Sequence, residues 1–474
     1  MSEDDFLNKL FEKYETVSKK EKDKIKEILK EVEEKKQIDK VITSFNTKFD
    51  LAEQILEYIP LFYDDVGMWW RWNHNKFCWD IVDEVDILNN VTYSSYANTI
   101  NAKERGEIIQ ALKQVSRQKR PEDAPLSWIQ FGDEIIDIET GDRFKATSKY
   151  FLTNPLPYKL GEIEDTPTID KIFEEWVGKE KVILLKEIMA YCMLRDYPIH
   201  RIFCFLGAGL NGKSCFLNLV RKFIGEDNVS STELDILLNS RFEITKLHKK
   251  LVCQMGETNF SEMNKTSILK KISGNDLIGF EYKNKKPFDE KNYAKILIAT
   301  NNLPATTDKT DGFYRRWISI DFPNRFTEKI DILSTIPEIE YNNLSLQLVG
   351  ILIDLLKNRS FTNEGTIEQR KKDFEDRSNP LEKFMKEYVT ESFEGYIWKW
   401  EFEKKLNEWC KENRFREISS VAIGKKMKDL QISQKLMSAG MFGESKQWRA
   451  WIGINWLNNQ DNQDNQVTST YSHM

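Results

Sequence analysis

The sequence predicts an α/β protein whose central domain is built on a parallel β-sheet. Residues 196–325 alternate short apolar runs with stretches of helical pattern, which is the rhythm of strands and helices in parallel sheets. Within that region, a glycine-rich segment at residues 207–214 separates an apolar run from an amphipathic stretch, as expected for a strand, a loop and a helix. The chain has 474 residues, of which 40% are apolar and 12% aromatic, so it can bury several cores.

Composition narrows the classes of protein to consider. No run of 18 apolar residues occurs, so we expect no membrane span, and the acidic N-terminus lacks the apolar region of a signal peptide. The net charge of −6 argues against a protein that coats nucleic acid with its whole surface, but it leaves room for a local basic site. The six cysteines show no zinc-ligand spacing, and we interpret them as small core residues in a reducing compartment.

Six segments of the chain differ in composition. The first is charged, with apolar residues near a helical period, and we interpret it as a solvated amphipathic helix; a partner-binding or oligomerising helix is the alternative. The last is rich in Asn, Gln, Asp and Ser, and we expect it to be disordered. The expected segments are a charged helical region (1–44), an aromatic-rich mixed α/β domain (45–195), the parallel-sheet domain (196–330), a helical connection (331–379), a small helix-and-strand domain (380–457) and a tail (458–474).

The aromatic-rich segment predicts short strands. Residues 68–79 fit two strands joined at a polar turn, and residues 128–138 give a second strand-turn signature. Tryptophans this dense could stack on nucleic-acid bases. We favour the interpretation that they fill a small hairpin core, because large aromatic side chains contribute most to stability when they are buried.

The strongest chemical signal is the glycine-rich segment, which fits the phosphate-loop pattern G-x-x-x-x-G-K-[ST]. A buried strand is expected before it, at residues 201–206, and a helix after it, at residues 215–224. Glycines let backbone N–H groups turn toward phosphates, and a helix N-terminus adds partial positive charge. We expect Lys213 to reach the β- and γ-phosphates of ATP, and the Ser214 hydroxyl to hold Mg²⁺. The nucleotide-binding candidates are Gly207, Ala208, Gly209, Leu210, Asn211, Gly212, Lys213 and Ser214.

Later apolar runs each place a polar side chain where a nucleotide site needs one. One run ends in Glu257, whose carboxylate is expected to hold the metal, orient the attacking water, or both. The next ends in Asn301, whose amide can bond the γ-phosphate or the water. Arg315 and Arg316 precede a further run. Arginine suits a developing phosphoryl charge, although a surface pair engaged in ion pairs is the alternative.

Together these motifs resemble those of the superfamily 3 helicases, and most closely the phage and plasmid primase–helicase family that includes the poxvirus helicase-primase. The resemblance rests on the phosphate loop, Glu257, a Ser-Gly-Asn-Asp stretch, Asn301 and the arginine pair, and it covers about residues 45–330. It implies an AAA+-like P-loop motor that binds ATP and Mg²⁺, assembles as a homo-hexameric ring and moves along one DNA strand. It also implies that Asn301 is the sensor, and that Arg316, or else Arg315, reaches into the neighbouring subunit's site.

The same family places a DNA-gripping hairpin between the Glu257 strand and the Asn301 strand. Residues 280–288 fall there, and their aromatic-flanked, lysine-rich tip suits a loop that touches single-strand phosphates in a channel. A solvated charged turn is the alternative. The lysines that we expect to bind DNA at this tip are Lys283, Lys285 and Lys286.

The segment at residues 380–457 resembles a winged helix. Its expected parts are two first helices (381–388 and 400–410), a recognition helix (421–430) and a wing strand (447–456). Basic residues outnumber acidic ones around the recognition helix, which suits a helix in the groove of duplex DNA, although winged helices also dock proteins. The candidate DNA contacts are Lys425, Lys426 and Lys428.

Two departures from the family pattern limit what the resemblance implies. Glu257 has no acidic neighbour, so the division between metal-holding and water-activating roles stays open. No paired aspartates in a strand-rich domain precede the aromatic segment, so we predict no primer synthesis by this chain. That expectation leaves room for a separate primase or polymerase as a partner.

The motifs thus predict an ATP-dependent, ring-forming DNA helicase in the replication of a virus, plasmid or integrated mobile element. Its expected location is the cytoplasm of a prokaryotic host or a virus-infected cell. One alternative is an ATPase switch, initiator or loader that binds DNA without processive unwinding. Another is a DNA-binding scaffold with an inactive ATPase, against which the intact set of polar motif residues argues.

Overall fold

The computed structural model describes residues 48–94, 101–207, 209–256, 262–263, 265–327, 331–412, 415, 417–441 and 444–457. The charged segment and the tail expected at the two ends lie outside the described residues. The chain divides into two compact units, unit 1 with Met1–Lys159 and Gly279–Glu290, and unit 2 with Leu160–Ile278 and Lys291–Met474. No helix among the described residues is long and apolar enough to cross a membrane.

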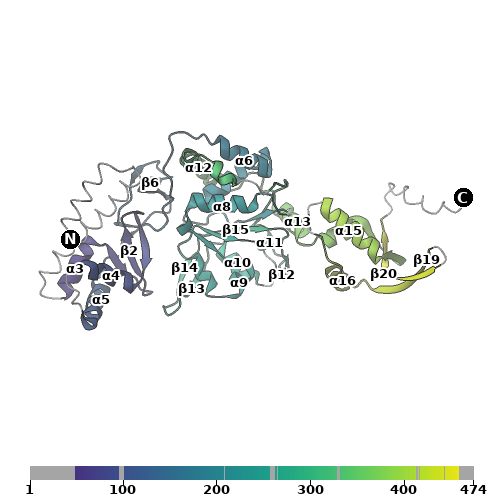
Figure 1. Cartoon of the computed structure of the whole chain (residues 1–474), viewed down its shortest axis with the longest axis horizontal. Helices are drawn as coiled ribbons and strands as arrows, with labels where there is room; N and C mark the ends of the chain where they lie inside the picture. Colours follow the sequence, from purple (N-terminus) through teal and green to yellow (C-terminus); the bar gives the residue numbers. More distant parts are fainter. Residues whose placement is uncertain are drawn as a thin grey trace, which may run out of the picture. The chain divides into compact units, whose positions relative to one another are not determined.

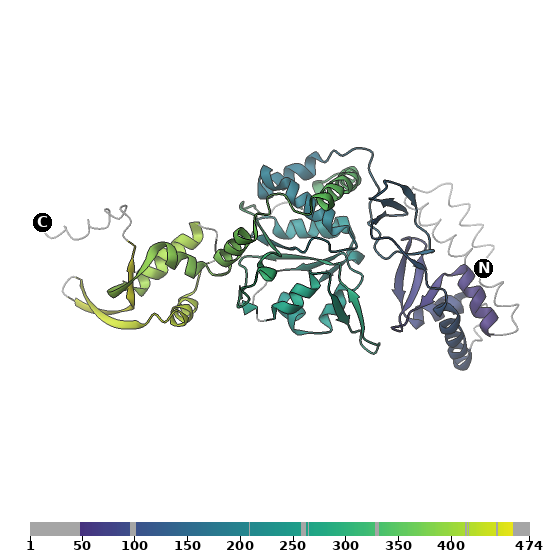
Figure 2. The ribbon, with the colours of Figure 1, turned by 180° about the vertical axis from the view of Figure 1, so that it is seen from behind.

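Unit 1 contains a three-stranded antiparallel sheet with helices packed on it (Figures 1 and 2). Its elements are α3 (Lys48–Tyr58), β1 (Leu61–Tyr63), β2 (Trp69–Asn73), β3 (Cys78–Val82), α4 (Glu84–Ser94) and α5 (Ala102–Arg117). Successive side chains of a strand face opposite sides. Trp69 therefore packs with apolar residues of α3 and α5, whereas Trp70, Trp72 and Trp79 join a second cluster around Phe62. All four tryptophans are buried, which confirms that they fill a core.

The rest of unit 1 is made of short strands. They are the parallel pair β4 (Glu122–Asp123) and β8 (Tyr150–Phe151), the antiparallel sheet β5 (Trp128–Phe131), β6 (Glu134–Asp137) and β7 (Arg143–Lys145), and the hairpin β13 (Leu277–Phe280) and β14 (Phe288–Lys291). The hairpin comes from the middle of the chain, yet its residues 279–290 belong to unit 1, whereas Leu277, Ile278 and Lys291 at its base belong to unit 2. Its Tyr282 and Phe288 pack against the aromatic cluster around Phe62. Their rings stack in parallel planes with centroids 6.3 Å apart.

Unit 2 is built on a five-stranded sheet in which all neighbouring strands are parallel. The strand order is β10 (Val229–Ser231), β11 (Val252–Met255), β15 (Lys295–Thr300), β9 (Ile202–Leu206) and β17 (Trp317–Asp321). Every residue of β9, β11 and β15 is buried, because helices cover both faces of the sheet. In Figure 1, α8 and α12 lie on one side and α9 and α10 on the other. The predicted mixed α/β class with a parallel sheet is confirmed; strand β10 is an addition that the apolar runs do not predict.

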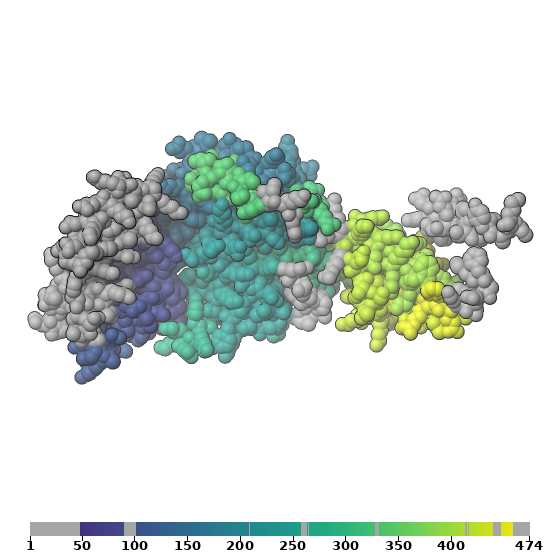
Figure 3. All heavy atoms as spheres, viewed as in Figure 1, coloured from purple at the N-terminus to yellow at the C-terminus, as the bar shows by residue number. Residues whose placement is uncertain are grey.

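Two helices of unit 2, α6 (Pro167–Val177) and α7 (Val182–Cys192), precede the sheet in the chain. The others up to residue 358 are α8 (Lys213–Ile224), α9 (Leu234–Asn239), α10 (Thr266–Ile272), α11 (Asp311–Tyr314) and α12 (Glu338–Asn358). A short parallel pair of strands, β12 (Glu262–Met263) and β16 (Ala305–Thr306), also belongs to this region. Figure 3 shows α12, in green, at the surface of this unit. Composition predicts a boundary near residue 195, whereas α6 and α7 pack with unit 2. Phe173 and Trp176 of α6 contact the ring of Phe216 on α8, which ties α6 to the sheet domain.

The C-terminal part of unit 2 has a small core of its own. Its elements are α13 (Ile367–Ser378), α14 (Pro380–Tyr388), β18 (Val389–Trp398), α15 (Lys399–Glu412), α16 (Ser420–Asp429), β19 (Gln434–Met441) and β20 (Glu444–Trp456). The three strands form an antiparallel sheet in the order β18-β20-β19. Phe384, Phe402 and Trp451 are among the side chains that fill the core between this sheet and the helices. Helices and a strand thus occur at the four positions where the winged-helix pattern expects them.

Candidate functional site

A cavity of about 1120 Å³ lies where the strands of the parallel sheet end. Residues 209–215 follow β9, Gly256 follows β11, and residues 299–301 end β15, and all three segments line the cavity. Ligands of open parallel sheets bind at this carboxyl edge, because the loops there carry side chains from several strands. The remaining walls come from α6, from Leu217 of α8 and from the segment after β17, through Thr168, Lys171, Ile172, Glu175, Trp176, Phe326, Thr327, Asp331, Ile332 and Thr335.

The phosphate-loop candidate contains glycines in backbone conformations that other residues rarely adopt. Gly209 and Gly212 have φ of 102° and 92°, and α8 begins at Lys213, directly after the loop. Backbone N–H groups of such a loop and of the first helical turn can point toward an anion. At Gly212 an added Cβ would lie 2.6 Å from the indole of Trp176, so this position has no room for a side chain. Ala208 lies outside the described residues.

Lys213 is buried within the loop that it follows. Its Nζ donates to the carbonyl oxygen of Gly207 at 2.5 Å and to Oδ1 of Asn211 at 3.0 Å. The side chain is only 7% exposed, yet it lines the cavity. A lysine ammonium has three donors, and the oxygens of a phosphate are stronger acceptors than a neutral amide. Lys213 is therefore placed to exchange these partners for phosphate oxygens.

Ser214 and Asn301 line the same cavity from the start of α8 and the end of β15. Glu257 lies outside the described residues, but it directly follows Gly256, which also lines the cavity. A serine hydroxyl and a carboxylate are oxygen ligands of the kind that Mg²⁺ prefers. The described part of the chain thus brings together the loop, Ser214 and Asn301, and it places the residue before Glu257 with them.

The two neighbouring arginines occupy different environments. Arg316 is 6% exposed, and its guanidinium donates to Ser273 Oγ at 3.1 Å, to the carbonyl oxygen of Lys270 at 3.2 Å and to that of Gly312. Burial, together with the charge of Arg315, lowers the pKa of Arg316. Arg315 is exposed. The fixed arginine and the accessible one are therefore adjacent in sequence, and neither is among the residues that line the cavity.

None of the candidate DNA-binding lysines is among the residues that line this cavity, and they form two groups. Lys283, Lys285 and Lys286 are exposed on the hairpin of unit 1, where Lys285 donates to the carbonyl oxygen of Gly67. The second group lies on α16 of unit 2. There Lys425 and Lys428 are exposed and Lys426 is partly buried.

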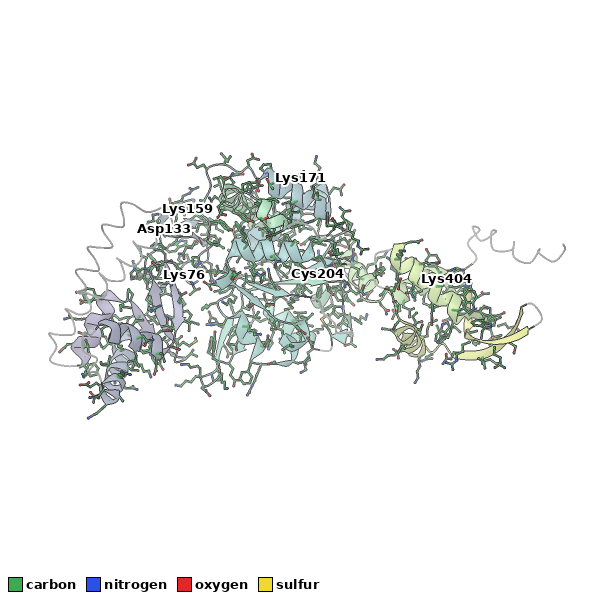
Figure 4. The ribbon with its side chains drawn as sticks, in the orientation of Figure 1. Lys76, Asp133, Lys159, Lys171, Cys204 and Lys404 are labelled. Carbon is green, nitrogen blue, oxygen red and sulfur yellow. The ribbon has the colours of Figure 1, made fainter. Side chains whose placement is uncertain are left out.

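A part of the cavity wall was not expected from the sequence. Ile172 and Trp176 of α6, with Phe326 and Ile332, give it an apolar side suited to a planar ring. Figure 4 labels Lys171 on α6 and Cys204 within the sheet. The apolar period of residues 169–177 could have indicated a buried helix, but no local signal says that this helix reaches the loop.

A second buried lysine lies at the opposite edge of the sheet, where β15 begins. Lys295 is fully buried, and its Nζ donates to the carbonyl oxygen of Asp196 at 2.8 Å and to that of Leu194. The ammonium lies 4.9 Å from the ring centroid of Tyr191 and 5.7 Å from that of Tyr197. Burial lowers the pKa of Lys295 to about 7.

Two comparisons of the sequence with known proteins give matches to part of the chain. A family model described as a family of unknown function (DUF5906) matches residues 205–316. A protein of Acanthamoeba polyphaga mimivirus named "Putative helicase L207/L206" is 24% identical over 210 residues. That match covers 42% of this chain and 22% of the viral protein, so the chain spans about a fifth of that relative's length.

Among solved structures, two apo structures of the NrS-1 C-terminal region are similar to this chain. One has a TM-score of 0.49 at 16% identity, and the other, described as the A form, has 0.46 at 14%. Each covers 86% of this chain and 100% of the other. In sequence, the similarity to a viral protein that carries a helicase name extends along 42% of the chain.

Proposed function

We propose that this chain is an ATP-dependent DNA helicase that works as a ring of identical subunits in the replication of a virus, plasmid or integrated mobile element. The observation that carries the proposal is the cavity at the carboxyl edge of the sheet. It joins a glycine loop, the Lys213 ammonium, Ser214 and Asn301. The helicase name of the viral relative supports the same class of function. DNA and a separate primase or polymerase are the expected partners.

In this proposal the loop and Lys213 bind the triphosphate of ATP. The N–H groups of the loop and of the first turn of α8 face the phosphates, and the ammonium contacts the β- and γ-phosphates. Ser214 and Glu257 would hold Mg²⁺, which neutralises developing charge on the phosphoryl group when it is bound. Asn301 orients the γ-phosphate or the attacking water. The apolar wall of Ile172 and Phe326 packs against the base.

We assign the trans-acting arginine to Arg315. Its side chain is exposed, whereas Arg316 is held by three acceptors of its own subunit. A residue that serves a neighbour's site must be accessible at the subunit surface, which Arg316 is not. Arg316 instead positions the turn between α11 and β17 that carries Arg315.

Two sets of lysines provide the proposed DNA contacts. The hairpin lysines suit the phosphates of a single strand in the ring channel, and Lys425 and Lys428 of α16 suit a duplex groove if the C-terminal elements act as a winged helix. One observation favours the ATPase switch or loader as a second candidate. Tyr282 and Phe288 of the hairpin pack within unit 1 against the aromatic cluster around Phe62, and a hairpin held in this way suits a protein that does not move it along DNA.

The test is ATP hydrolysis with and without forked DNA. We expect Lys213→Ala to lower nucleotide affinity and turnover by about 10²-fold or more, because a preorganised charge is removed from the phosphates. Glu257→Gln should retain binding and lose turnover. The control is Lys179→Ala, which removes an exposed lysine outside the cavity. Wild-type rates in both site variants would refute ATP hydrolysis at this cavity, and DNA-stimulated hydrolysis without strand separation would favour the switch or loader.

A further inference from the structure

The side chain of Asn211 is held at both ends. It is 4% exposed, its Oδ1 accepts from Lys213 Nζ at 3.0 Å, and its Nδ2 donates to the carbonyl oxygen of Phe322 at 3.3 Å. Because a lysine ammonium can only donate, the oxygen of the amide must face Lys213 and the nitrogen must face Phe322. The amide thus connects the phosphate loop to the residue that follows β17.

The amide of Asn211 packs against the first glycine of the loop. A Cβ added at Gly207 would lie 1.8 Å from Nδ2 of Asn211 and 2.8 Å from the carbonyl oxygen of Phe322. The amide therefore fills the space that a side chain at the first glycine of the loop would need. A shift of Asn211 must move the loop, the Phe322 carbonyl, or both, because protein interiors are closely packed.

An ion pair continues the connection from β17 to α13. Asp321, the residue before Phe322, accepts from both terminal nitrogens of Arg377 on α13, at 2.5 and 2.9 Å. Arg377 Nε also donates to Asp373 Oδ1 at 2.9 Å. A two-bond arginine–carboxylate pair fixes orientation as well as distance. Helix α13 is thereby clamped to the strand beside β9.

Helix α13 leads directly into the elements that form the small C-terminal core, α14 to β20, which are called the C-terminal elements below. Only Asn379 separates α13 from α14. A polar cavity of about 360 Å³ is lined by Gly207 and Asn301 of the candidate site and also by Arg377, Lys383 and Glu412 of α13, α14 and α15. The candidate site and the C-terminal elements therefore share one boundary, at the point where the Asp321–Arg377 pair lies.

We propose that Asn211 is a positioning residue that couples the binding of phosphate to α13 and the C-terminal elements. The proposal rests on the proposed ATP site. Phosphate oxygens compete with Oδ1 of Asn211 and the carbonyl of Gly207 for the Lys213 ammonium. When Lys213 turns to phosphate, the amide gives up one of its two partners and its hold on the Phe322 carbonyl changes. The Asp321–Arg377 pair transmits that change to α13.

The test combines ATP binding with hydrogen exchange of backbone amides in residues 379–398, using the full chain. In the wild-type chain we expect a non-hydrolysable ATP analogue to change exchange in this segment. Arg377→Met should leave the KM for ATP and basal kcat within about 2-fold, since no contact to nucleotide is removed, but it should abolish the exchange change. Asn211→Asp should raise KM about 10-fold, because a carboxylate holds Lys213 more strongly than an amide, and it should also abolish the exchange change, because it removes the donor to the Phe322 carbonyl.

The control is Arg370→Met, which removes the other arginine of α13. Arg370 donates to the carbonyl oxygens of Glu364 and Gly365 and pairs with the Glu364 carboxylate at 3.4 Å, and these partners all lie outside β17. An exchange change that survives in Arg377→Met, or that disappears equally in Arg370→Met, overturns the coupling. If the wild-type chain binds the analogue without any exchange change, the coupling also fails while the ATP site stands. If the wild-type chain does not bind the analogue at all, it is the proposed function that fails.

Discussion

The two edges of the parallel sheet in unit 2 each bury a lysine, and the two lysines differ in what surrounds them. Lys213 at the carboxyl edge is 7% exposed and Lys295 at the amino edge is 0% exposed. Each donates to oxygen acceptors of its own chain. Lys213, however, lines a cavity of about 1120 Å³, whereas Lys295 is enclosed by Tyr191 and Tyr197.

This comparison shows that burial and hydrogen bonding alone do not identify a functional lysine. Lys295 donates to carbonyl oxygens of the turn before β9 and has no exposed surface at which a ligand could reach it. Lys213 has acceptors that a ligand can replace and a cavity in which the ligand can lie. Adjacent space, more than a perturbed environment, is what makes Lys213 the candidate ligand-binding lysine of the two.

Arg315 and Arg316 show the same contrast between an accessible and an enclosed basic side chain. Replacing Arg315 should have the largest effect, which is on ATP turnover. If Arg315 acts on a neighbour's nucleotide, Arg315→Ala should lower DNA-stimulated ATP turnover about 10³-fold or more, because arginine fingers contribute about 10³–10⁵ in rate. The unfolding midpoint in denaturant should stay unchanged, because the side chain is exposed. Turnover is checked by steady-state phosphate release.

Arg316→Ala should affect the stability of the fold, which Arg315→Ala should leave unchanged. It leaves Ser273 Oγ and two carbonyl oxygens without their donor and opens a cavity, so we expect a decrease of about 2–4 kcal/mol in the free energy of unfolding. Mixed rings of Lys213→Ala and Arg315→Ala subunits should regain part of the activity, because some interfaces combine an intact loop with an intact arginine. Full activity of Arg315→Ala would exclude it as the finger.

Lys295 gives an effect of intermediate size that depends on pH. Its pKa is about 7 in the folded chain and about 10.4 when unfolded, so between these values the unfolded state binds more protons and stability rises with pH. From pH 7 to pH 8 we expect the free energy of unfolding to rise by about 1 kcal/mol in the wild type. This window stays below the pKa of about 8.5 at which unfolded cysteine thiols ionise.

Lys295→Met removes the titrating group and should flatten this rise. Denaturant unfolding at the two pH values gives the comparison, and ATP turnover per folded molecule should be unaffected. An equal rise in the variant would mean that other groups cause it. The pH profile of stability thus distinguishes the enclosed Lys295 from Lys213, whose removal is expected to lower turnover.

The hairpin lysines give the smallest expected effect. Lys283 and Lys286 are exposed, whereas Lys285 is bonded to Gly67, so the first two are better placed to contact phosphates. Replacing both with Ala should make the dependence of single-strand affinity on salt less steep, by about 0.7 in the log–log slope for each phosphate that is no longer neutralised. Fluorescence anisotropy over a salt series measures the slope. The matched control is Lys285→Ala, and an unchanged slope in the double variant would leave these lysines as a solvated turn.

The features that the sequence predicts best are those set by neighbouring residues. The strand expected at 201–206 is β9, and the helix expected at 215–224 is α8, which begins at Lys213. Both are predicted from the spacing of apolar residues and from the glycines that separate the strand from the helix. The tryptophan core of unit 1 is likewise visible from its dense aromatic strands.

What could not be predicted depends on contacts between distant residues. Arg316 is buried and donates to Ser273, which is 43 positions earlier, and the sequence does not distinguish it from Arg315. The approach of Trp176 to Gly212 and the anchorage of Tyr282 on unit 1 are of the same kind. Such contacts depend on which surfaces meet after folding. The spacing of apolar residues in the sequence indicates that a surface is apolar, but it does not indicate which other surface will cover it.

The hairpin described above has a consequence for dissecting the chain into fragments. Residues 279–290 leave the sheet domain and pack with residues that precede position 160. A fragment that starts at residue 160 would therefore carry Tyr282 and Phe288 without the aromatic cluster that covers them. The reciprocal fragment, ending at residue 159, would expose the matching patch. Exposed aromatic patches of this kind favour aggregation, so the boundary that is simplest in sequence is a poor place to cut.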